Sequence, residues 1–284
     1  MKLAVLLREA KDKLKSVNVD EYALDAELFM AEVLNKDRLF VLLNLDYELN
    51  NNEAESFKNM ISRRLNHEPT AYIIGRREFM GMDFAVEEGV LIPRPDTEIL
   101  VETIMEKGTQ AKTCLEIGTG SGCISVSLSK LLGLNVTGVD ISQKAVEISK
   151  KNAKANGVDN TCKFLLGDMF SPFKNYEKFD IIVSNPPYIR KDVLPNLMDD
   201  VKNFEPILAL DGGDDGLYFY REIINQAENY LNPNGMVFFE IGYDQKEDVS
   251  LLFKEKGFEN IKTVKDLSGL DRVVYATCGG ARGI

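Results

Sequence analysis

The chain has 284 residues, of which 44% are hydrophobic, and its formal net charge is −11. This apolar content excludes an intrinsically disordered chain, and runs such as MVFF and LFVLL fall far short of the roughly 20 residues that a membrane-spanning helix needs. The acidic balance argues against direct nucleic-acid binding, because proteins that grip phosphates normally present a basic surface.

The N-terminal segment and the cysteines indicate a cytoplasmic protein. The opening MKLAVLLREAKDKLK starts like a signal peptide, but it soon becomes charged and has no small-residue cleavage site. The cysteines lack CxxC spacing and His67 is the only histidine, which disfavours a Cys–His metal site and a histidine-activated nucleophile. We expect no metal, and we interpret Cys114, Cys123, Cys162 and Cys278 as reduced core residues.

Residues 1–78 are predicted to form a small, all-helical N-terminal domain. Successive segments carry apolar residues at three-to-four spacing, and Asp20, Asp37 and Asn51 or Asn52 stand where N-caps belong. These helices carry no obvious chemical group, so we interpret the domain as a packing or substrate-docking unit.

A change of period marks the boundary with the rest of the chain. Residues 79–92 alternate apolar and polar side chains, with Gly81 and Gly89 as turn points, which predicts a β-hairpin linker. The sequence PRPDTE follows, in which the prolines stiffen the chain and Asp96 is expected to cap a helix. The predicted catalytic domain covers residues 93–284.

Beyond residue 110 the chain alternates strands and helices. Near-continuous apolar strands such as TCLEI and FDIIVS, separated by amphipathic helices, indicate a parallel sheet covered on both faces. The segments FENIKTV and RVVYATC lie too close together for a crossover helix and are expected to pair antiparallel. The predicted fold class is α/β, a doubly wound, mostly parallel, seven-stranded sheet with a C-terminal antiparallel hairpin.

The loop EIGTGSG, after the first of these strands, is a candidate ligand site. Ligands of a doubly wound sheet bind at the carboxyl ends of its strands, and the bare backbone at Gly118, Gly120 and Gly122 allows a ligand to approach closely. The dinucleotide-binding fingerprint needs its third glycine one position later, where Cys123 stands, which argues against hydride transfer.

Two further loops suit a nucleoside. Asp140 ends the second strand, where a carboxylate can bind ribose hydroxyls and can also cap the following helix. Asp168 and Met169 follow the third strand, where an acid can accept a hydrogen bond from the adenine amine and an apolar side chain can cover the ring.

The sequence SNPPYI, Ser184 to Ile189, follows the fourth strand and suits methylation of a planar amino nitrogen. A carboxamide nitrogen is a poor nucleophile because its lone pair is conjugated with the carbonyl, as the amide rotation barrier of roughly 18–20 kcal/mol shows. The Asn185 side-chain oxygen and the Pro186 carbonyl oxygen can accept both N–H bonds of such a group. The prolines keep these acceptors in place and Tyr188 can stack on the flat group. Together the four loops resemble those of class I S-adenosylmethionine-dependent methyltransferases.

Over nearly its whole length the chain resembles the release-factor glutamine methyltransferases, the PrmC/HemK family. The resemblance is carried by PRPDTE (93–98), LEIGTGSGCI (115–124), SNPPYI (184–189), FEPILALDGGDDGL (204–217) and DLSGLDR (266–272). It implies transfer of a methyl group from S-adenosyl-L-methionine to the glutamine N5 of the Gly-Gly-Gln motif in class 1 peptide-chain release factors. The by-product would be S-adenosyl-L-homocysteine, and the pathway would be translation termination in the cytoplasm.

The resemblance also implies roles for individual residues. The cofactor would be bound by Gly118, Thr119, Gly120, Ser121, Gly122, Asp140, Asp168, Met169 and Asn185. Asn185, Pro186 and Tyr188 would be catalytic, and with Pro187 they would bind the substrate glutamine. Glu205, Asp211 and Gly212–Gly213 would shape the rim of the site.

Two other functions compete with this interpretation. An adenine-N6 nucleic-acid methyltransferase would share the chemistry, but it would need a basic groove or a target-recognition domain. A non-catalytic cofactor-binding or docking module is disfavoured, because all four loops carry residues suited to the chemistry. The run DGGDDG lacks the spacing of a calcium loop and is interpreted as a tight turn.

Overall fold

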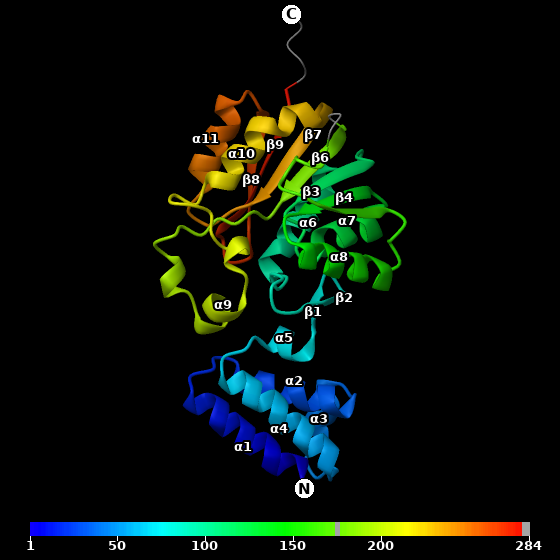
Figure 1. Ribbon diagram of the computed structural model, residues 1–284, viewed down its shortest axis with the longest axis vertical. Helices are drawn as coiled ribbons and strands as arrows, with labels where there is room; N and C mark the ends of the chain where they lie inside the picture. Colours follow the sequence, from blue (N-terminus) through cyan, green and yellow to red (C-terminus); the bar gives the residue numbers. More distant parts are fainter. Residues whose placement is uncertain (174–176, 280–284) are drawn as a thin grey trace, which may run out of the picture. The chain divides into compact units, whose positions relative to one another are not determined.

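The computed structural model describes residues 1–173 and 177–279 and shows two compact units (Figure 1). The helical unit comprises residues 1–76 and 198–204, and the sheet unit comprises residues 77–197 and those from 205 onward. No helix in the described ranges is long and apolar enough to cross a membrane.

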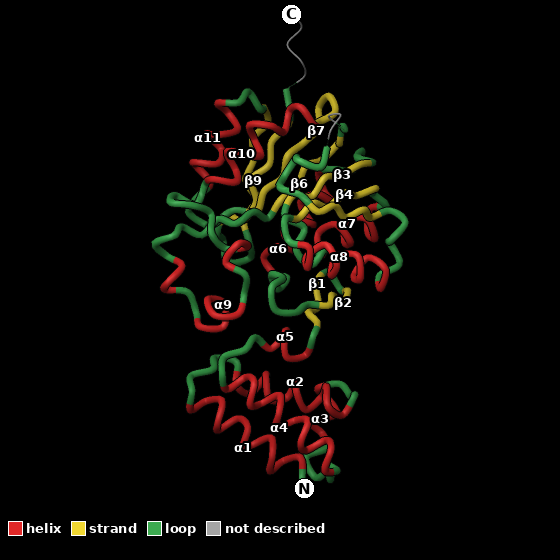
Figure 2. Tube along the Cα trace, in the orientation of Figure 1, coloured by secondary structure: helices red, strands yellow, loops and turns green. Residues whose placement is uncertain are grey.

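The helices of residues 1–76 share one core, to which the short helix at residues 199–204 contributes no buried residue, and Figure 2 shows helices as the unit's regular elements. Its buried residues include Leu7, Phe29 and Phe57, one from each of three helices. The helices are α1 (Leu3–Ser16), α2 (Tyr22–Leu34), α3 (Arg38–Leu43), α4 (Asn51–Leu65), α5 (Thr70–Ile74) and α9 (Asp199–Phe204). A buried ion pair joins Arg64 Nε to Asp25 Oδ2 at 2.7 Å, and Thr70 donates to the other oxygen of Asp25.

The helix starts in this unit were predicted with mixed success. Asp37 caps α3, since its side chain accepts from the Phe40 amide at 2.7 Å. The cap of α4 is Asn50, not Asn51 or Asn52, because Asn50 forms a reciprocal capping box with Glu53. The prediction for Asp20 was wrong, because α2 begins after Glu21, which makes no side-chain cap.

The sheet unit confirms the predicted fold class. Its strand order is β5-β4-β3-β6-β7-β9-β8, in which β3 to β7 run parallel and β9 is antiparallel to both β7 and β8. The strands are β3 (Thr113–Ile117), β4 (Asn135–Asp140), β5 (Cys162–Leu166), β6 (Phe179–Ser184), β7 (Leu231–Glu240), β8 (Glu259–Lys265) and β9 (Asp271–Thr277). The order reverses between β3 and β6, which is where a doubly wound sheet opens a ligand crevice.

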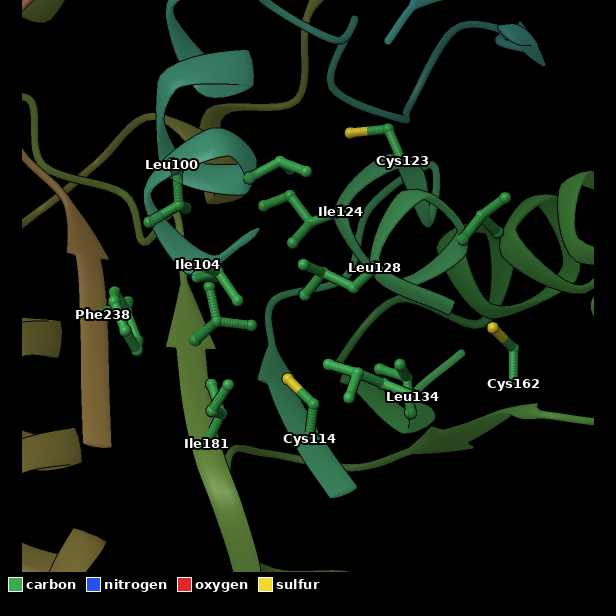
Figure 3. Close-up of a cluster of buried hydrophobic side chains, with 14 of the residues drawn as sticks. Leu100, Ile104, Cys114, Cys123, Ile124, Leu128, Leu134, Cys162, Ile181 and Phe238 are labelled. Carbon is green, nitrogen blue, oxygen red and sulfur yellow. The ribbon is translucent and has the colours of Figure 1, made fainter. Parts of the chain in front are cut away.

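Helices cover both faces of this sheet, as the near-continuous apolar strands predicted. Neighbouring strand residues alternate between two cores: Cys114 and Ile181 pack with one set of helices, Leu115 and Ile182 with the other. Figure 3 shows the first core. Its helices are α6 (Pro95–Lys107), α7 (Cys123–Leu132) and α8 (Gln143–Ala155); those of the second are α10 (Tyr218–Ala227) and α11 (Lys246–Glu255). Short 3₁₀ turns are η1 (Leu194–Asn196), η2 (Ile207–Ala209) and η3 (Glu228–Tyr230).

The β-hairpin lies earlier than predicted. Its strands are β1 (Arg76–Phe79) and β2 (Met82–Ala85), and residues 86–92 form no strand. The Ala85 amide donates to Asn152 Oδ1 at 2.8 Å, and Phe84 is fully buried in the first core. The hairpin therefore packs on the sheet unit through its apolar side chains, which alternation alone could not reveal.

The start of α6 also differs from the prediction. Arg94 is its N-cap and Pro95 its first residue, a position where the missing N–H of proline costs nothing. Asp96 lies in the first turn and pairs with Arg272 at 3.2 Å. It does not cap the helix.

Candidate active site

A pocket of about 340 Å³ opens at the carboxyl ends of the parallel strands, where the strand order reverses. It brings together the four loops singled out in the sequence. The predicted site residues that line it are Gly118, Thr119, Gly120, Ser121, Asp140, Asp168, Met169, Asn185, Pro186 and Pro187. Gly122 and Tyr188 are absent from its lining.

The glycine loop after β3 presents bare backbone to this pocket. Gly118 and Gly120 have positive φ angles of 75° and 54°, and a Cβ built at either would meet no atom within 4 Å. A Cβ at Gly122 would lie 2.8 Å from Ser149 Cβ. The first two glycines thus leave room for a ligand, whereas the third lets α8 pack closely.

Glu116, in β3, holds the glycine loop by hydrogen bonds and was not predicted as a site residue. Its carboxylate Oε2 accepts from the Thr119 hydroxyl at 2.8 Å, from the Ser125 amide at 3.1 Å and from the Ser125 hydroxyl. Burial raises the pKa of Glu116 to about 7, although these donors oppose the shift. The sequence signal was an acidic residue inside an apolar strand.

Asp140 ends β4 at the edge of the pocket. Its Oδ2 accepts from the Gly120 amide at 2.8 Å and its Oδ1 from the Ser142 amide at 2.9 Å. Burial raises its pKa, against the lowering effect of these amides. Asp140 does not cap α8, because Ser142 does so by accepting from the Ala145 amide. A carboxylate offers about four acceptor sites in all, so Asp140 keeps acceptor capacity for a ligand.

Asp168 and Met169 border the pocket after β5. The Asp168 amide donates to the Ser171 hydroxyl at 2.9 Å, and the Asp168 side chain is exposed. Met169 adopts a positive φ of 45°, uncommon for a residue other than glycine. The adenine contacts assigned to this pair stay a prediction.

Asn185 follows β6 and directs its side-chain nitrogen away from bulk solvent. Its Nδ2 donates to the Thr97 hydroxyl oxygen at 3.1 Å, and the preceding Ser184 hydroxyl ties β6 to β3 by donating to the Ile117 carbonyl at 2.7 Å. Pro186 is buried and Pro187 half-buried. The loop is therefore anchored on both sides of its asparagine.

Tyr188 is half-buried and packs against the second core, and its backbone is held by residues that were not predicted as site residues. Gln245 Nε2 donates to the carbonyls of Tyr188 and Gly216, each at 3.1 Å. Gln245 Oε1 accepts from the Gly242 amide at 2.9 Å and from the Tyr220 hydroxyl at 3.3 Å. This glutamine joins three segments that lie far apart in the sequence, which explains why no local pattern revealed it.

The run DGGDDG forms the other support of the same loop. The Ile189 amide donates to the Leu210 carbonyl at 3.0 Å, and the Gly212 amide donates to the Ile189 carbonyl at 2.8 Å. A Cβ at Gly212 would lie 2.7 Å from Tyr188 Cα, so only glycine allows this approach. The described residues contain no cluster able to hold a metal ion.

The expected rim residues lie behind the pocket wall. Glu205 is buried and pairs with Arg94 at 2.6 Å, and Arg94 lines the pocket. Neither Glu205 nor the segment from Asp211 to Gly213 lines it. Their neighbours Pro206, Leu208 and Ala209 do so instead.

Comparisons with known proteins cover nearly the whole chain. Residues 5–75 match a family model described as the PrmC N-terminal domain, and residues 94–201 match one described as the methyltransferase small domain. A release factor glutamine methyltransferase from Clostridium acetobutylicum is 44% identical over 285 residues, covering 99% of this chain and 100% of that protein. One of the same name from Clostridium botulinum is 44% identical over 280 residues, covering 97% and 99%.

A solved structure supports the fold. The T. thermophilus 16S rRNA N2 G1207 methyltransferase RsmC, in complex with AdoMet and guanosine, superposes with a TM-score of 0.51 at 22% identity. The match covers 71% of this chain and 49% of that chain. At this identity the likeness concerns the architecture of the sheet.

Proposed function

Because this chain belongs to the release factor glutamine methyltransferase family, we propose that it methylates the glutamine N5 of the Gly-Gly-Gln motif in class 1 peptide-chain release factors. The methyl donor in this proposal is S-adenosylmethionine. The family and the enzyme class predicted from the sequence are confirmed.

The proposal depends above all on one observation: the Asn185–Pro187 loop and the glycine loop line the same pocket. The residues present fit the proposed donor. Gly118 and Gly120 leave open space where side chains would stand, and Asp140 places a carboxylate at the edge of that space. When bound, S-adenosylmethionine supplies an electrophilic methyl carbon.

The chain's own residues would then prepare the substrate nitrogen. The Asn185 side-chain oxygen and the Pro186 carbonyl accept the two N–H bonds of the glutamine amide and so fix the direction of its lone pair. On methylation, the nitrogen held by Asn185 and Pro186 would exchange one proton, lost to solvent, for the methyl group that the donor would supply. Positioning of this kind contributes up to about 7–11 kcal/mol in favourable systems.

The test is methyl transfer in vitro. The chain is incubated with S-adenosylmethionine and a class 1 release factor, and mass spectrometry locates any added CH₂ on the peptide that carries the Gly-Gly-Gln motif. Duplex DNA is the matched alternative substrate. Methylation of DNA but not of the release factor would favour the adenine-N6 alternative and overturn the proposal.

Two variants separate the proposed roles. Asn185→Ala should reduce turnover strongly while S-adenosylmethionine affinity stays within a few-fold. Asp140→Ala should weaken cofactor binding first. The helical N-terminal domain remains a candidate for substrate docking.

A further inference from the structure

The two ends of the Asn185 side-chain amide are nearly the same size but opposite in polarity. The mechanism proposed above needs the oxygen to face the substrate, because only the oxygen accepts a hydrogen bond. A side chain reversed about its last bond would present N–H groups to the substrate's own N–H groups. Some feature of the chain must therefore select one orientation.

Glu240 lies where it can make that selection. The parallel register pairs Ser184 with Phe239, so Asn185 and Glu240 are the next residues on two neighbouring strands. Glu240 is 1% exposed, and its backbone carbonyl is fixed by the Tyr220 hydroxyl at 2.9 Å.

The polar neighbours of the Glu240 carboxyl are Thr97 and Asn185. The donors on both side chains lower the pKa of Glu240. Asn185 Nδ2 also donates to Thr97 Oγ1 at 3.1 Å. Within the described part of the chain, Glu240 Oε2 meets no donor, so this carboxyl has acceptor capacity to spare.

We propose that Glu240 is a positioning residue: its carboxylate, together with Thr97, holds the Asn185 side-chain NH₂, and the Asn185 oxygen is thereby turned toward the substrate amide. A carboxylate can only accept hydrogen bonds. Thr97 must therefore donate its hydroxyl proton to the Glu240 carboxylate. The Thr97 oxygen can then only accept a hydrogen bond from Asn185, so Asn185 must present its side-chain nitrogen to Thr97. This inference rests on the proposed function, since it concerns how the substrate amide is held.

Protonation of Glu240 would remove this selection, because a protonated carboxyl both donates and accepts. Burial raises the pKa of Glu240 to about 7, against the lowering effect of its polar neighbours. The charged or titratable groups facing it are Asp96 on α6, Arg272 on β9, Cys123 on α7, Tyr188 after β6 and Tyr220 on α10. Asp96 raises the pKa and Arg272 lowers it.

The experiment compares the native chain with Glu240→Gln, an isostere that both donates and accepts. Methyl transfer to a class 1 release factor is measured against pH, and S-adenosylmethionine affinity is measured by calorimetry. One pH unit above the pKa of Glu240, kcat of Glu240→Gln should be roughly tenfold lower, the size expected for one misdirected hydrogen bond. One unit below it, the two rates should converge, while cofactor affinity stays within about twofold.

A second pair of variants guards against a misfolded glutamine variant. Thr97→Val removes the hydroxyl and should lower kcat as Glu240→Gln does, whereas Thr97→Ser keeps the hydroxyl and should lie closer to the native chain.

The outcomes are distinct. A native kcat for Glu240→Gln above the pKa, an unchanged pH profile, or equal rates for the two Thr97 variants would overturn the positioning role. If the native chain itself transfers no methyl group to the release factor, the proposed function fails and this inference falls with it.

Discussion

Gly120 offers a sharp test of the cofactor site, because its replacement has two separable consequences. Gly120 has a positive φ of 54°, and its missing Cβ leaves open space in the lining of the pocket. Gly120→Ala should cost about 1 kcal/mol of folding stability, since left-handed backbone is unfavourable for alanine. The new methyl group should also compete with the cofactor for space.

The second effect can be sized from packing. Forcing an extra methyl group into a well-packed contact typically costs about 1–3 kcal/mol. If the cofactor occupies the space beside Gly120, its affinity should fall roughly 5- to 150-fold. Calorimetric titration with S-adenosylmethionine measures the affinity, and urea denaturation measures the stability.

Gly133 provides the matched control. It ends α7 with a positive φ of 71°, a Cβ there would also meet nothing within 4 Å, and it lies outside the lining of the pocket. Gly133→Ala should therefore lose a similar amount of stability and keep the native affinity. Equal affinities for the two variants would refute the placement of the cofactor against the glycine loop.

Three further predictions follow from buried groups. Gln245→Leu should cost about 2–4 kcal/mol of stability, because several buried partners lose their hydrogen bonds, and it should slow methyl transfer by loosening Tyr188. Denaturation and turnover measured on the same sample check both effects. A native turnover would argue against the role of Gln245 in supporting Tyr188. Burial raises the pKa of Glu116 from 4.5 to about 7, so its contribution to stability is complete below pH 4.5 and is lost as pH rises through about 7. Glu116→Gln should flatten the pH dependence of the free energy of unfolding over this window. An unchanged pH dependence in this variant would contradict the raised pKa. The four cysteines are buried and free, and burial raises their pKa values, that of Cys123 to about 12. An alkylating reagent should therefore modify them only after denaturation. Rapid labelling of the native chain would count against the raised pKa values.

The glycine loop, Asp140 and Asn185 could be brought together from the sequence because parallel strands impose their geometry. Each of these residues follows a strand, and the carboxyl ends of parallel strands meet at one edge of the sheet. Strand count and the closing hairpin were equally predictable, since both depend on local period and on loop length. No long-range contact had to be known.

The supporting residues could not be predicted, because their roles depend on register and on closure of the fold. Glu240 stands beside Asn185 only because Phe239 pairs with Ser184. Gln245 reaches Tyr188 across 57 positions of the sequence. The hairpin was misplaced for the same reason. Phe84 is buried by helices that lie far from it in the sequence, and the alternation of apolar and polar residues does not show which residues pair as strands.

The buried glutamates Glu116 and Glu240 illustrate how partners, and not burial alone, decide a role. Burial raises the pKa of Glu116 and of Glu240 to about 7 in both cases. Oε2 of Glu116 accepts hydrogen bonds from three donors, which tie the glycine loop to α7. Ionisation of Glu116 therefore changes the orientation of that loop little. Glu240 faces side chains that can rotate, and its Oε2 meets no donor in the described ranges. Loss of its charge therefore alters which end of an amide is turned toward the substrate, so the same physical perturbation should alter stability at one carboxyl and turnover at the other.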